Sequence, residues 1–361
     1  MEVKYGAHVT TTCQDIDAAH IAHGIERWFQ ANARALPWRI ERSAWKALVS
    51  EIMLQQTQAS RVAERFDAVM QEFPTPRAMA DAPIDVLLAH WQGLGYYRRA
   101  RSLHASACMI VQDFNGKTPT DSDALQKLPG VGRYTAGSIA SIVGGHREPI
   151  VDGNVRRVLS RIWADDGVTG DADLEARTWD RATELVQACC DPGSCNEGLM
   201  EFGATVCTPR NPGCDACPLA TACRANASRA AESIPRPRKR LERPVEYVHA
   251  LLLMRGDNVL LEQRPEGGRW AGMWQPVSHV HTAALGARAV GTVFDVGGVR
   301  SAGGFDHNLT HRQLKVRVFR ATAPSGMRLA SSTRRWVHRD APGVALSSLG
   351  RKILSVMAGV I

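Results

Sequence analysis

Apolar residues recur at intervals of three and four along the first 200 or so residues of the chain. The clearest stripes are Trp45, Leu48, Val49, Ile52 and Met53, then Ile84, Leu87, Leu88 and Trp91, and then Val155, Val158, Leu159 and Ile162. This spacing places the side chains on one face of a helix. Short breakers containing proline or glycine separate the stripes. The pattern therefore predicts a mostly helical part over residues 21–224.

The pattern changes after Cys223. Residues 225–245 are small and polar, then basic with interspersed prolines, as in an extended linker. Beyond it, residues 248–254, 259–263 and 315–321 have the composition of strands. We therefore expect a separate C-terminal α+β domain over 246–361. Residues 1–20 are expected to form a flexible tail.

Charge is unevenly divided along the chain. Residues 1–224 hold 23 Lys and Arg against 27 Asp and Glu, so 23 − 27 = −4, whereas residues 225–361 hold 21 against 9, so 21 − 9 = +12. A basic C-terminal part suits a polyanion such as nucleic acid, although a solvated basic surface would look the same. No apolar run reaches the roughly 18 residues of a membrane span, and the N-terminus lacks a secretory apolar region. We expect a cytoplasmic protein without membrane contact.

Four of the nine cysteines lie within 17 residues: Cys207, Cys214, Cys217 and Cys223. An odd cysteine count without a secretory segment argues against a disulfide framework and for a metal site. Four thiolates can enclose a [4Fe–4S] cluster or bind tetrahedral zinc. Zinc ribbons usually present two Cys-x2-Cys pairs, and only one is present here. The spacing therefore counts against a zinc ribbon, and an iron–sulfur cluster, another zinc site and free thiols remain the alternatives.

A turn with two glycines, Gly130 and Gly132, lies in the segment 128–136 between two predicted helices. Such a turn can leave backbone N–H groups at the following helix N-terminus free to hold a phosphate. Most glycine turns are only turns. This segment is a candidate DNA contact that the local pattern alone does not decide.

Two acidic residues, Glu51 and Asp152, lie at positions where a carboxyl group could take part in catalysis. Asp152 precedes an amphipathic helix and could simply be its N-cap. A capping carboxylate is also held ionised, as an oxocarbenium-like transition state requires of a neighbour. Glu51 flanks the stripe of Leu48 and Ile52 and could be an ordinary surface glutamate. If desolvated there, its pKa would rise enough to make it a general acid.

Four segments, SEIMLQQTQ, GLGYYRRAR, LPGVGRYTAG and VDGNVRRVL, precede the cysteines in that order. Together they resemble consecutive signatures of the adenine DNA glycosylase (MutY) family, over residues 36–223. The resemblance implies a helix-hairpin-helix glycosylase fold with an iron–sulfur loop over 207–223. It implies an enzyme, monomeric and nucleoid-associated if bacterial, that removes adenine opposite 8-oxoguanine or guanine from double-stranded DNA.

The same resemblance assigns roles to individual residues. Glu51 corresponds to the acid that protonates the flipped adenine through N7, and Asp152 to the carboxylate that stabilises the sugar cation. The remaining matches are Tyr134 and Asn154, which position these groups and the water; Gln56 and Tyr96, which wedge into the duplex; Gly130 and Gly132 in the DNA-binding hairpin; Arg39 at the adenine pocket; and the four cysteines as cluster ligands.

Tyr134 also bears on the type of reaction. In the related endonuclease III family a lysine at this position attacks the sugar as an amine and forms a Schiff base. A phenol cannot form an imine, so we expect water as the final acceptor and no strong strand cleavage. The alternatives are a bifunctional pyrimidine-lesion glycosylase with lyase activity, and a DNA damage reader that does not catalyse.

Residues 246–361 resemble, less strongly, the Nudix-like domain of the same family. The similarity lies in residues 261–265, 272–274 and 335–337. The Gly-x5-Glu-x7-Arg-Glu-x2-Glu-Glu box of pyrophosphate hydrolases is missing from the sequence, which argues against a nucleotide hydrolase. The resemblance makes Thr310 and His311 candidate contacts to 8-oxoguanine, with Leu309 where the family has phenylalanine. An ordinary loop remains the alternative.

Overall fold

The computed structural model describes residues 16–239, 242–265, 267–329 and 331–358. Its contacts divide the chain into two compact units. One contains the described residues up to Glu51 together with Thr118–Lys239, and the other contains Ile52–Lys117 together with the described residues after Lys239. The helical part that the sequence suggested as one domain over 21–224 is thus shared between the two units. Helix α1 already begins at Ala18, inside the segment expected to be a tail.

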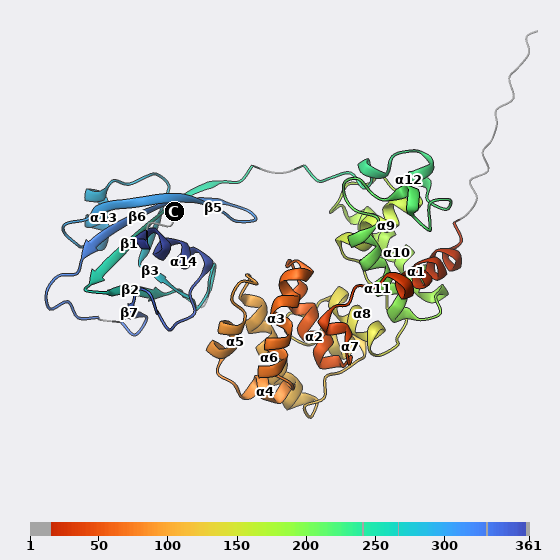
Figure 1. Cartoon of the computed structure of the whole chain (residues 1–361), viewed down its shortest axis with the longest axis horizontal. Coiled ribbons are helices and arrows are strands. Elements are labelled where there is room, and N and C mark those ends of the chain that lie inside the picture. Colours follow the sequence, from red (N-terminus) through yellow and green to blue (C-terminus); the bar gives the residue numbers. More distant parts are fainter. Residues whose placement is uncertain (1–15, 240–241, 266, 330, 359–361) are drawn as a thin grey trace, which may run out of the picture. The chain divides into compact units, whose positions relative to one another are not determined.

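The first unit is helical (Figure 1). Its elements are α1 (Ala18–Asn32), η1 (Pro37–Arg39), the part of α2 (Ala44–Leu54) up to Glu51, α7 (Ser122–Gln126), α8 (Arg133–Ile142), α9 (Gly153–Trp163), α10 (Ala172–Ala188), α11 (Pro192–Thr205), η2 (Cys214–Ala216), α12 (Arg224–Ala227) and η3 (Ala231–Ser233). Helix η3 and all but the first residue of α12 fall within the expected linker 225–245.

Helices α1, α9, α10 and α11 enclose the core of this unit. The predicted stripe of α9 is buried in that core, since Val155, Val158, Leu159 and Ile162 are each 3% exposed or less. The stripes predicted in residues 45–53 and 84–91 also lie in helices, with Leu48 and Leu87 fully buried. The helical periodicity is confirmed, and α9 packs against α11.

The second unit combines helices with a seven-stranded sheet. Its elements are α3 (Ala59–Glu72), α4 (Pro76–Asp81), α5 (Ile84–His90), α6 (Arg98–Asp113), β1 (Val245–Arg255), β2 (Asn258–Gln263), β3 (Trp274–Pro276), β4 (Ser278–His281), α13 (Ala287–Phe294), β5 (Arg300–Asn308), β6 (Gln313–Thr322), β7 (Arg334–His338), α14 (Ser348–Ser355) and η4 (Val356–Ala358).

The sheet is mixed, with the strand order β3-β2-β1-β6-β5; β4 also pairs with β1, and β7 with β2. Strands β1 and β6 are parallel, and the other pairs are antiparallel. The three strands predicted at 248–254, 259–263 and 315–321 are confirmed as β1, β2 and β6. Gly256, at φ +58°, makes the tight turn between β1 and β2.

Strand β1 is buried on both faces. Val248 and Leu252 pack in the same core as Ile353 of α14, whereas Leu251 and Leu253 pack with Val290 of α13. Side chains alternate between the faces of a strand, so the two helices cover opposite faces of the sheet (Figure 1). This is the α+β architecture expected for the C-terminal domain.

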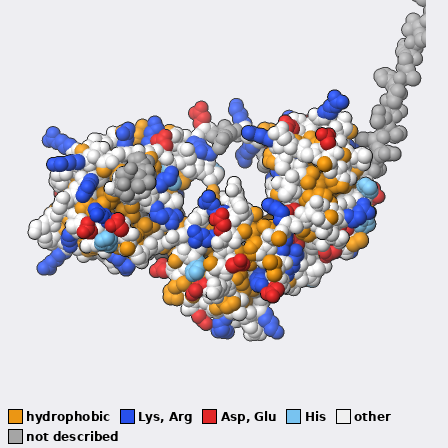
Figure 2. Space-filling view, in the orientation of Figure 1, with side chains coloured by type: hydrophobic (Ala, Val, Ile, Leu, Met, Phe, Trp, Pro, Cys, Tyr) orange, Lys and Arg blue, Asp and Glu red, His pale blue; other side chains and the backbone are white. Residues whose placement is uncertain are grey.

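Among the residues that the structure describes, no helix is both long and apolar enough to cross a membrane. On the face drawn in Figure 2, Lys and Arg side chains are scattered among Asp and Glu rather than gathered into one patch.

Candidate active site

Glu51, near the end of α2, is only 8% exposed. The Ser138 hydroxyl of α8 donates a hydrogen bond to its Oε1 over 2.8 Å. Burial raises the pKa of Glu51 to about 7, although hydrogen bonds from Ser138 and Tyr134 oppose the rise. The negative charges of Glu197 and Asp152 add to it. The carboxyl can therefore be protonated near neutral pH, as a general acid must be.

Asp152 is the N-cap of α9. Its Oδ1 accepts a hydrogen bond from the Val155 backbone N–H at 2.7 Å, and its Oδ2 accepts one from Asn154 Nδ2 at 3.0 Å. Burial raises the pKa of Asp152, and these hydrogen bonds, together with the charge of Arg157, oppose the rise. Asp152 is thus the helix cap, and this role is compatible with the catalytic role that the resemblance predicted for the same carboxyl group.

Asn154 is fixed from two sides. Arg157 donates to its Oδ1 at 2.9 Å, while its own amide group donates to Asp152. Gly203 of α11 lies directly against it, because a Cβ built on Gly203 would be 2.7 Å from the Asn154 Cβ. Only glycine lets α11 come this close to the first turn of α9.

Tyr134 lies one helical turn before Ser138 on α8. Its hydroxyl oxygen lies 2.9 Å from the Met200 Sδ and also within hydrogen-bonding range of Glu51, so its single proton can be donated to either. Burial and the nearby carboxylates of Glu51 and Asp152 raise the Tyr134 pKa well above its usual value, so the phenol keeps its proton. These mutual effects place Glu51, Tyr134 and Asp152 within electrostatic reach of one another. Ser138 was missed from the sequence, although its i+4 spacing from Tyr134 could have revealed it.

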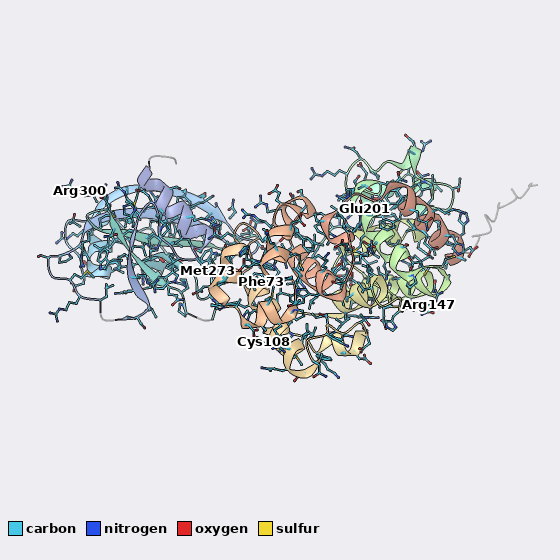
Figure 3. The ribbon with its side chains drawn as sticks, turned by 60° about the horizontal axis from the view of Figure 1, so that its bottom comes forward. Phe73, Cys108, Arg147, Glu201, Met273 and Arg300 are labelled. Atoms are coloured by element: carbon cyan, nitrogen blue, oxygen red, sulfur yellow. The ribbon has the colours of Figure 1, made fainter. Side chains whose placement is uncertain are left out.

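Arg39, the predicted pocket residue, is bound to two glutamates of α11. Its Nε lies 3.0 Å from Glu197 Oε1, and one terminal nitrogen lies 3.1 Å from Glu201 Oε2. Both glutamates are buried, and Glu201 is labelled in Figure 3. The guanidinium also stacks over the Phe29 ring, 5.0 Å from its centre. These two glutamates were not among the predicted site residues, although their i, i+4 spacing on one helix could have suggested a shared cation.

Gln56 and Tyr96, the predicted wedge residues, are both exposed. Their backbone φ angles are +56° and +45°. Residues other than glycine rarely adopt this left-handed region. Strain of this kind persists only where the surroundings impose it, and it is frequent at functional sites.

The side chain of Arg99 holds both of these backbone segments in place. This guanidinium, 8% exposed, donates to carbonyls on both sides: to Ile52 and Met53 just before Gln56, and to Leu94 and Gly95 just before Tyr96. It also donates to Thr57 Oγ1 at 2.9 Å, and it stacks over the Tyr96 ring. One cation therefore holds both strained loops. No local sequence pattern pointed to it.

The glycine turn lies between α7 and α8, as predicted. Gly130 has φ +83°, and Gly132 is the N-cap of α8. A Cβ built on Gly132 would meet no atom within 4 Å, so the space before the helix N-terminus is open. Such a terminus attracts anions.

The four cysteines line one cavity beside α9. Arg161, 2% exposed, donates to Cys207 Sγ at 3.4 Å and to the Thr208 carbonyl at 2.7 Å. Burial raises the pKa of Cys217 to about 11 and also raises the pKa values of Cys214 and Cys223. Four thiols around one cavity fit a cationic metal cluster bound by all four sulfurs, and the buried guanidinium suits the net negative charge of a cluster with four thiolates.

Comparison with known proteins agrees with this geometry. Residues 49–184 match the model of the HhH-GPD superfamily base excision DNA repair proteins, and residues 249–356 match a NUDIX domain. The chain is 32% identical over 244 residues to an adenine DNA glycosylase of Buchnera aphidicola (from Acyrthosiphon pisum), covering 67% of this chain and 69% of that protein. The chain belongs to the adenine DNA glycosylase family.

Two further proteins show how much of the chain is similar to known proteins. The adenine DNA glycosylase of Rattus norvegicus is 40% identical over 228 residues, which cover 61% of this chain and 44% of the rat protein. The chain thus spans less than half the length of that relative. A thermostable thymine-DNA glycosylase of known structure superposes with a TM-score of 0.53 at 26% identity, over 58% of this chain and 97% of that one.

In the Nudix-like domain of this family member, Thr310 and His311 lie at the tip of the β5–β6 hairpin. The turn is closed by a 2.9 Å hydrogen bond from the Leu309 N–H to the Arg312 carbonyl. Both candidate side chains are exposed, while Leu309 packs on the domain core. A 2.7 Å hydrogen bond joins the hydroxyls of Thr310 and Tyr96. The two loops that the sequence linked to the lesion and to the wedge are therefore neighbours.

Proposed function

We propose that this protein is an adenine-specific DNA glycosylase acting in base excision repair. Its substrate is adenine opposite 8-oxoguanine or guanine in double-stranded DNA, and it hydrolyses the N-glycosidic bond as a monomer in the cytoplasm. The observation that carries the proposal is the buried Glu51, with its pKa near 7, in electrostatic contact with the helix-capping Asp152.

The two carboxyls have complementary tasks. Adenine is a poor leaving group as an anion, so its ring must be protonated before the bond breaks. The base must first leave the stack, at a cost of a few kcal/mol. Glu51 then donates its proton to adenine N7. With a pKa of about 7, a large fraction of Glu51 holds that proton at neutral pH.

Asp152 acts on the sugar. Loss of the base leaves an oxocarbenium-like cation, which an adjacent carboxylate stabilises. The cap hydrogen bond from Val155 and the amide of Asn154 hold the Asp152 oxygens in place. Water then completes the hydrolysis, with Asn154 and Tyr134 as positioning residues.

Tyr134 supports a monofunctional reaction. Its high pKa keeps the phenol neutral, and a phenol cannot form the imine through which lyases cut the strand. The bifunctional alternative would need an amine elsewhere in the site. The alternative of a non-catalytic reader leaves the raised pKa of Glu51 without a use.

We assign the DNA contacts to residues in exposed loops and at a helix N-terminus. We assign Gln56 and Tyr96 as the residues that wedge into the duplex where the base leaves, and the hydrogen bonds of Arg99 to the segments before them support this role. Gly130 and Gly132 offer the N-terminus of α8 to a phosphate, and Arg39 borders the base pocket. Thr310 and His311 are proposed to contact 8-oxoguanine.

A [4Fe–4S] cluster held by Cys207, Cys214, Cys217 and Cys223 is part of the proposal. It would cross-link the 207–223 segment through iron–thiolate bonds, in a structural role. A 2+ cluster with four thiolates carries about −2, and Arg161 lies where it would offset that charge.

The test is single-turnover base release from three duplexes: adenine opposite 8-oxoguanine, adenine opposite guanine, and thymine glycol opposite adenine. Strand breaks are scored before and after alkali. Release of adenine, with breaks only after alkali, is expected. Direct nicking at thymine glycol would replace this proposal with the lyase alternative, and binding without base release would replace it with the reader.

A further inference from the structure

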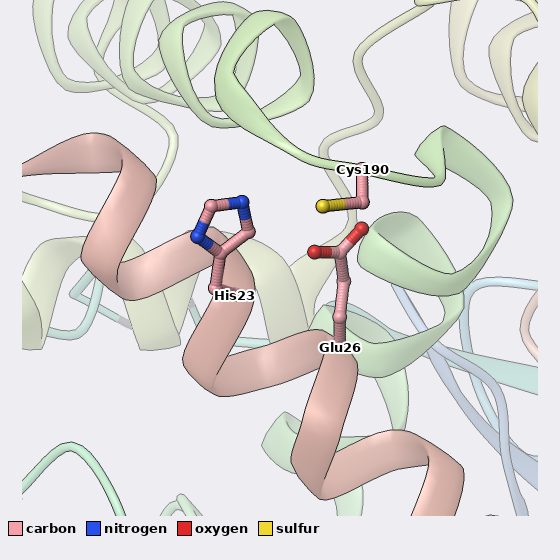
Figure 4. A group of neighbouring side chains, drawn as sticks. All are labelled: His23, Glu26 and Cys190. Atoms are coloured by element: carbon pink, nitrogen blue, oxygen red, sulfur yellow. The ribbon is translucent and has the colours of Figure 1, made fainter.

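Three side chains that can bind a transition metal meet on the surface of the first unit, and the proposed reaction uses none of them. His23 and Glu26 are one turn apart on α1, and Cys190 lies in the connection between α10 and α11. Figure 4 shows the Cys190 thiol and the Glu26 carboxylate turned toward each other, with the His23 imidazole beside them. None belongs to the four-cysteine loop.

The geometry is close to that of a metal site. One donor atom from each residue lies within 4.8 Å of the other two. Zinc bonds of about 2.0–2.3 Å at tetrahedral angles place donor atoms roughly 3.3–3.8 Å apart. The remaining difference is therefore at most about 1.5 Å, which rotation of the exposed Cys190 and half-buried His23 side chains can supply.

Glu26 anchors the group. It is 5% exposed, and its Oε1 accepts a hydrogen bond from the Asp191 backbone N–H at 2.6 Å. That bond fixes the residue next to Cys190 against α1. A buried carboxylate is costly unless positive charge or several donors offset it, and a divalent cation would offset it directly.

We propose that His23, Glu26 and Cys190 form a zinc site. Imidazole, carboxylate and thiolate together suit zinc, whereas calcium and magnesium prefer oxygen donors alone. Three protein ligands leave a fourth position for water. The ion would link α1 to the start of α11, two helices that already pack on each other. Its effect would be to stabilise the first unit, independently of base release.

The experiment counts zinc and iron on the same samples of the full-length protein, after brief chelation, desalting and titration with zinc chloride. One zinc per chain with undiminished iron is expected, together with a higher Tm. Because loss of an outer-shell partner of a metal ligand already weakens binding about 10–100-fold, loss of a ligand in Cys190→Ser or His23→Gln should weaken it at least about 100-fold.

Two matched variants serve as controls. Cys108→Ser removes a thiol of α6, and His20→Gln removes an exposed imidazole one turn before His23. Both should bind zinc like the wild type. With cobalt in place of zinc, a thiolate charge-transfer band should be present in the controls and missing in Cys190→Ser. Equal zinc affinity in all five proteins, no zinc at all, or zinc that rises only as iron falls would overturn the proposal.

Discussion

Replacing Glu51 by glutamine should stabilise the protein at alkaline pH. Glutamine has nearly the same shape, and the Ser138 hydroxyl can still donate to its Oε1. What disappears is the cost of ionising a buried carboxyl. The pKa of Glu51 rises from 4.5 to about 7, and each unit corresponds to about 1.4 kcal/mol, so the penalty is on the order of 3 kcal/mol.

The size of the effect depends on pH. Between pH 4.5 and 7 the unfolded chain has lost the Glu51 proton while the folded chain retains it. This contribution to wild-type stability is therefore fully present below about pH 4.5, falls as pH rises, and is lost above about pH 7. Glu51→Gln has no such dependence. It should be more stable than the wild type by about 3 kcal/mol near pH 8, and equally stable near pH 4.5.

Thermal unfolding followed by circular dichroism, from about pH 5 to about pH 8, measures the difference between the two proteins. Glu64→Gln, an exposed glutamate on α3, is the control and should follow the wild type throughout. If Glu51→Gln is less stable at every pH, or its advantage does not grow with pH, Glu51 is an ionised and well-paired carboxylate. Glu51 would then not hold the proton that a general acid needs.

Three further substitutions probe the site. Asp152→Asn keeps the helix cap but removes the charge, so base release should fall by at least about 10²-fold while DNA affinity is retained; unchanged turnover would favour the reader. Arg99→Lys should slow base release from a duplex more than from single-stranded DNA, where no wedge is needed, and Arg98→Lys should slow neither; equal slowing on both substrates would contradict a wedge-positioning role. Gly203→Ala should lower stability by about 1–3 kcal/mol and slow base release, because the added methyl displaces Asn154; an unchanged rate would show that Asn154 needs no fixed position.

Local patterns predicted the parts of the molecule that depend on neighbours in sequence. The apolar stripe from Val155 to Ile162 predicted α9, and Asp152 before it predicted the cap, because both follow from the geometry of one helix. The strands β1, β2 and β6 were predicted from the composition of their own segments, which is likewise a local property. The resemblance then assigned roles to Glu51 and Asp152 that the patterns left open.

Long-range contacts could not be predicted in this way. Arg99 reaches carbonyls more than 40 residues away, and Arg39 reaches Glu197 and Glu201 across more than 150 residues. Residues 52–117 belong to one unit with the C-terminal part because of long-range contacts of the same kind. Such contacts depend on how elements pack, and no spacing along the chain records them. A single glutamate likewise does not show its own burial, on which the pKa of Glu51 depends.

The most direct test of the central claim is the pH dependence of single-turnover adenine release opposite 8-oxoguanine, measured for the wild type and for Glu51→Gln. If Glu51 supplies the proton, the wild-type rate should fall about tenfold per pH unit above pH 7 or so, and the variant should release almost no adenine at any pH. A wild-type rate that stays level across this range, or a variant that still releases adenine at the wild-type rate, would contradict the account.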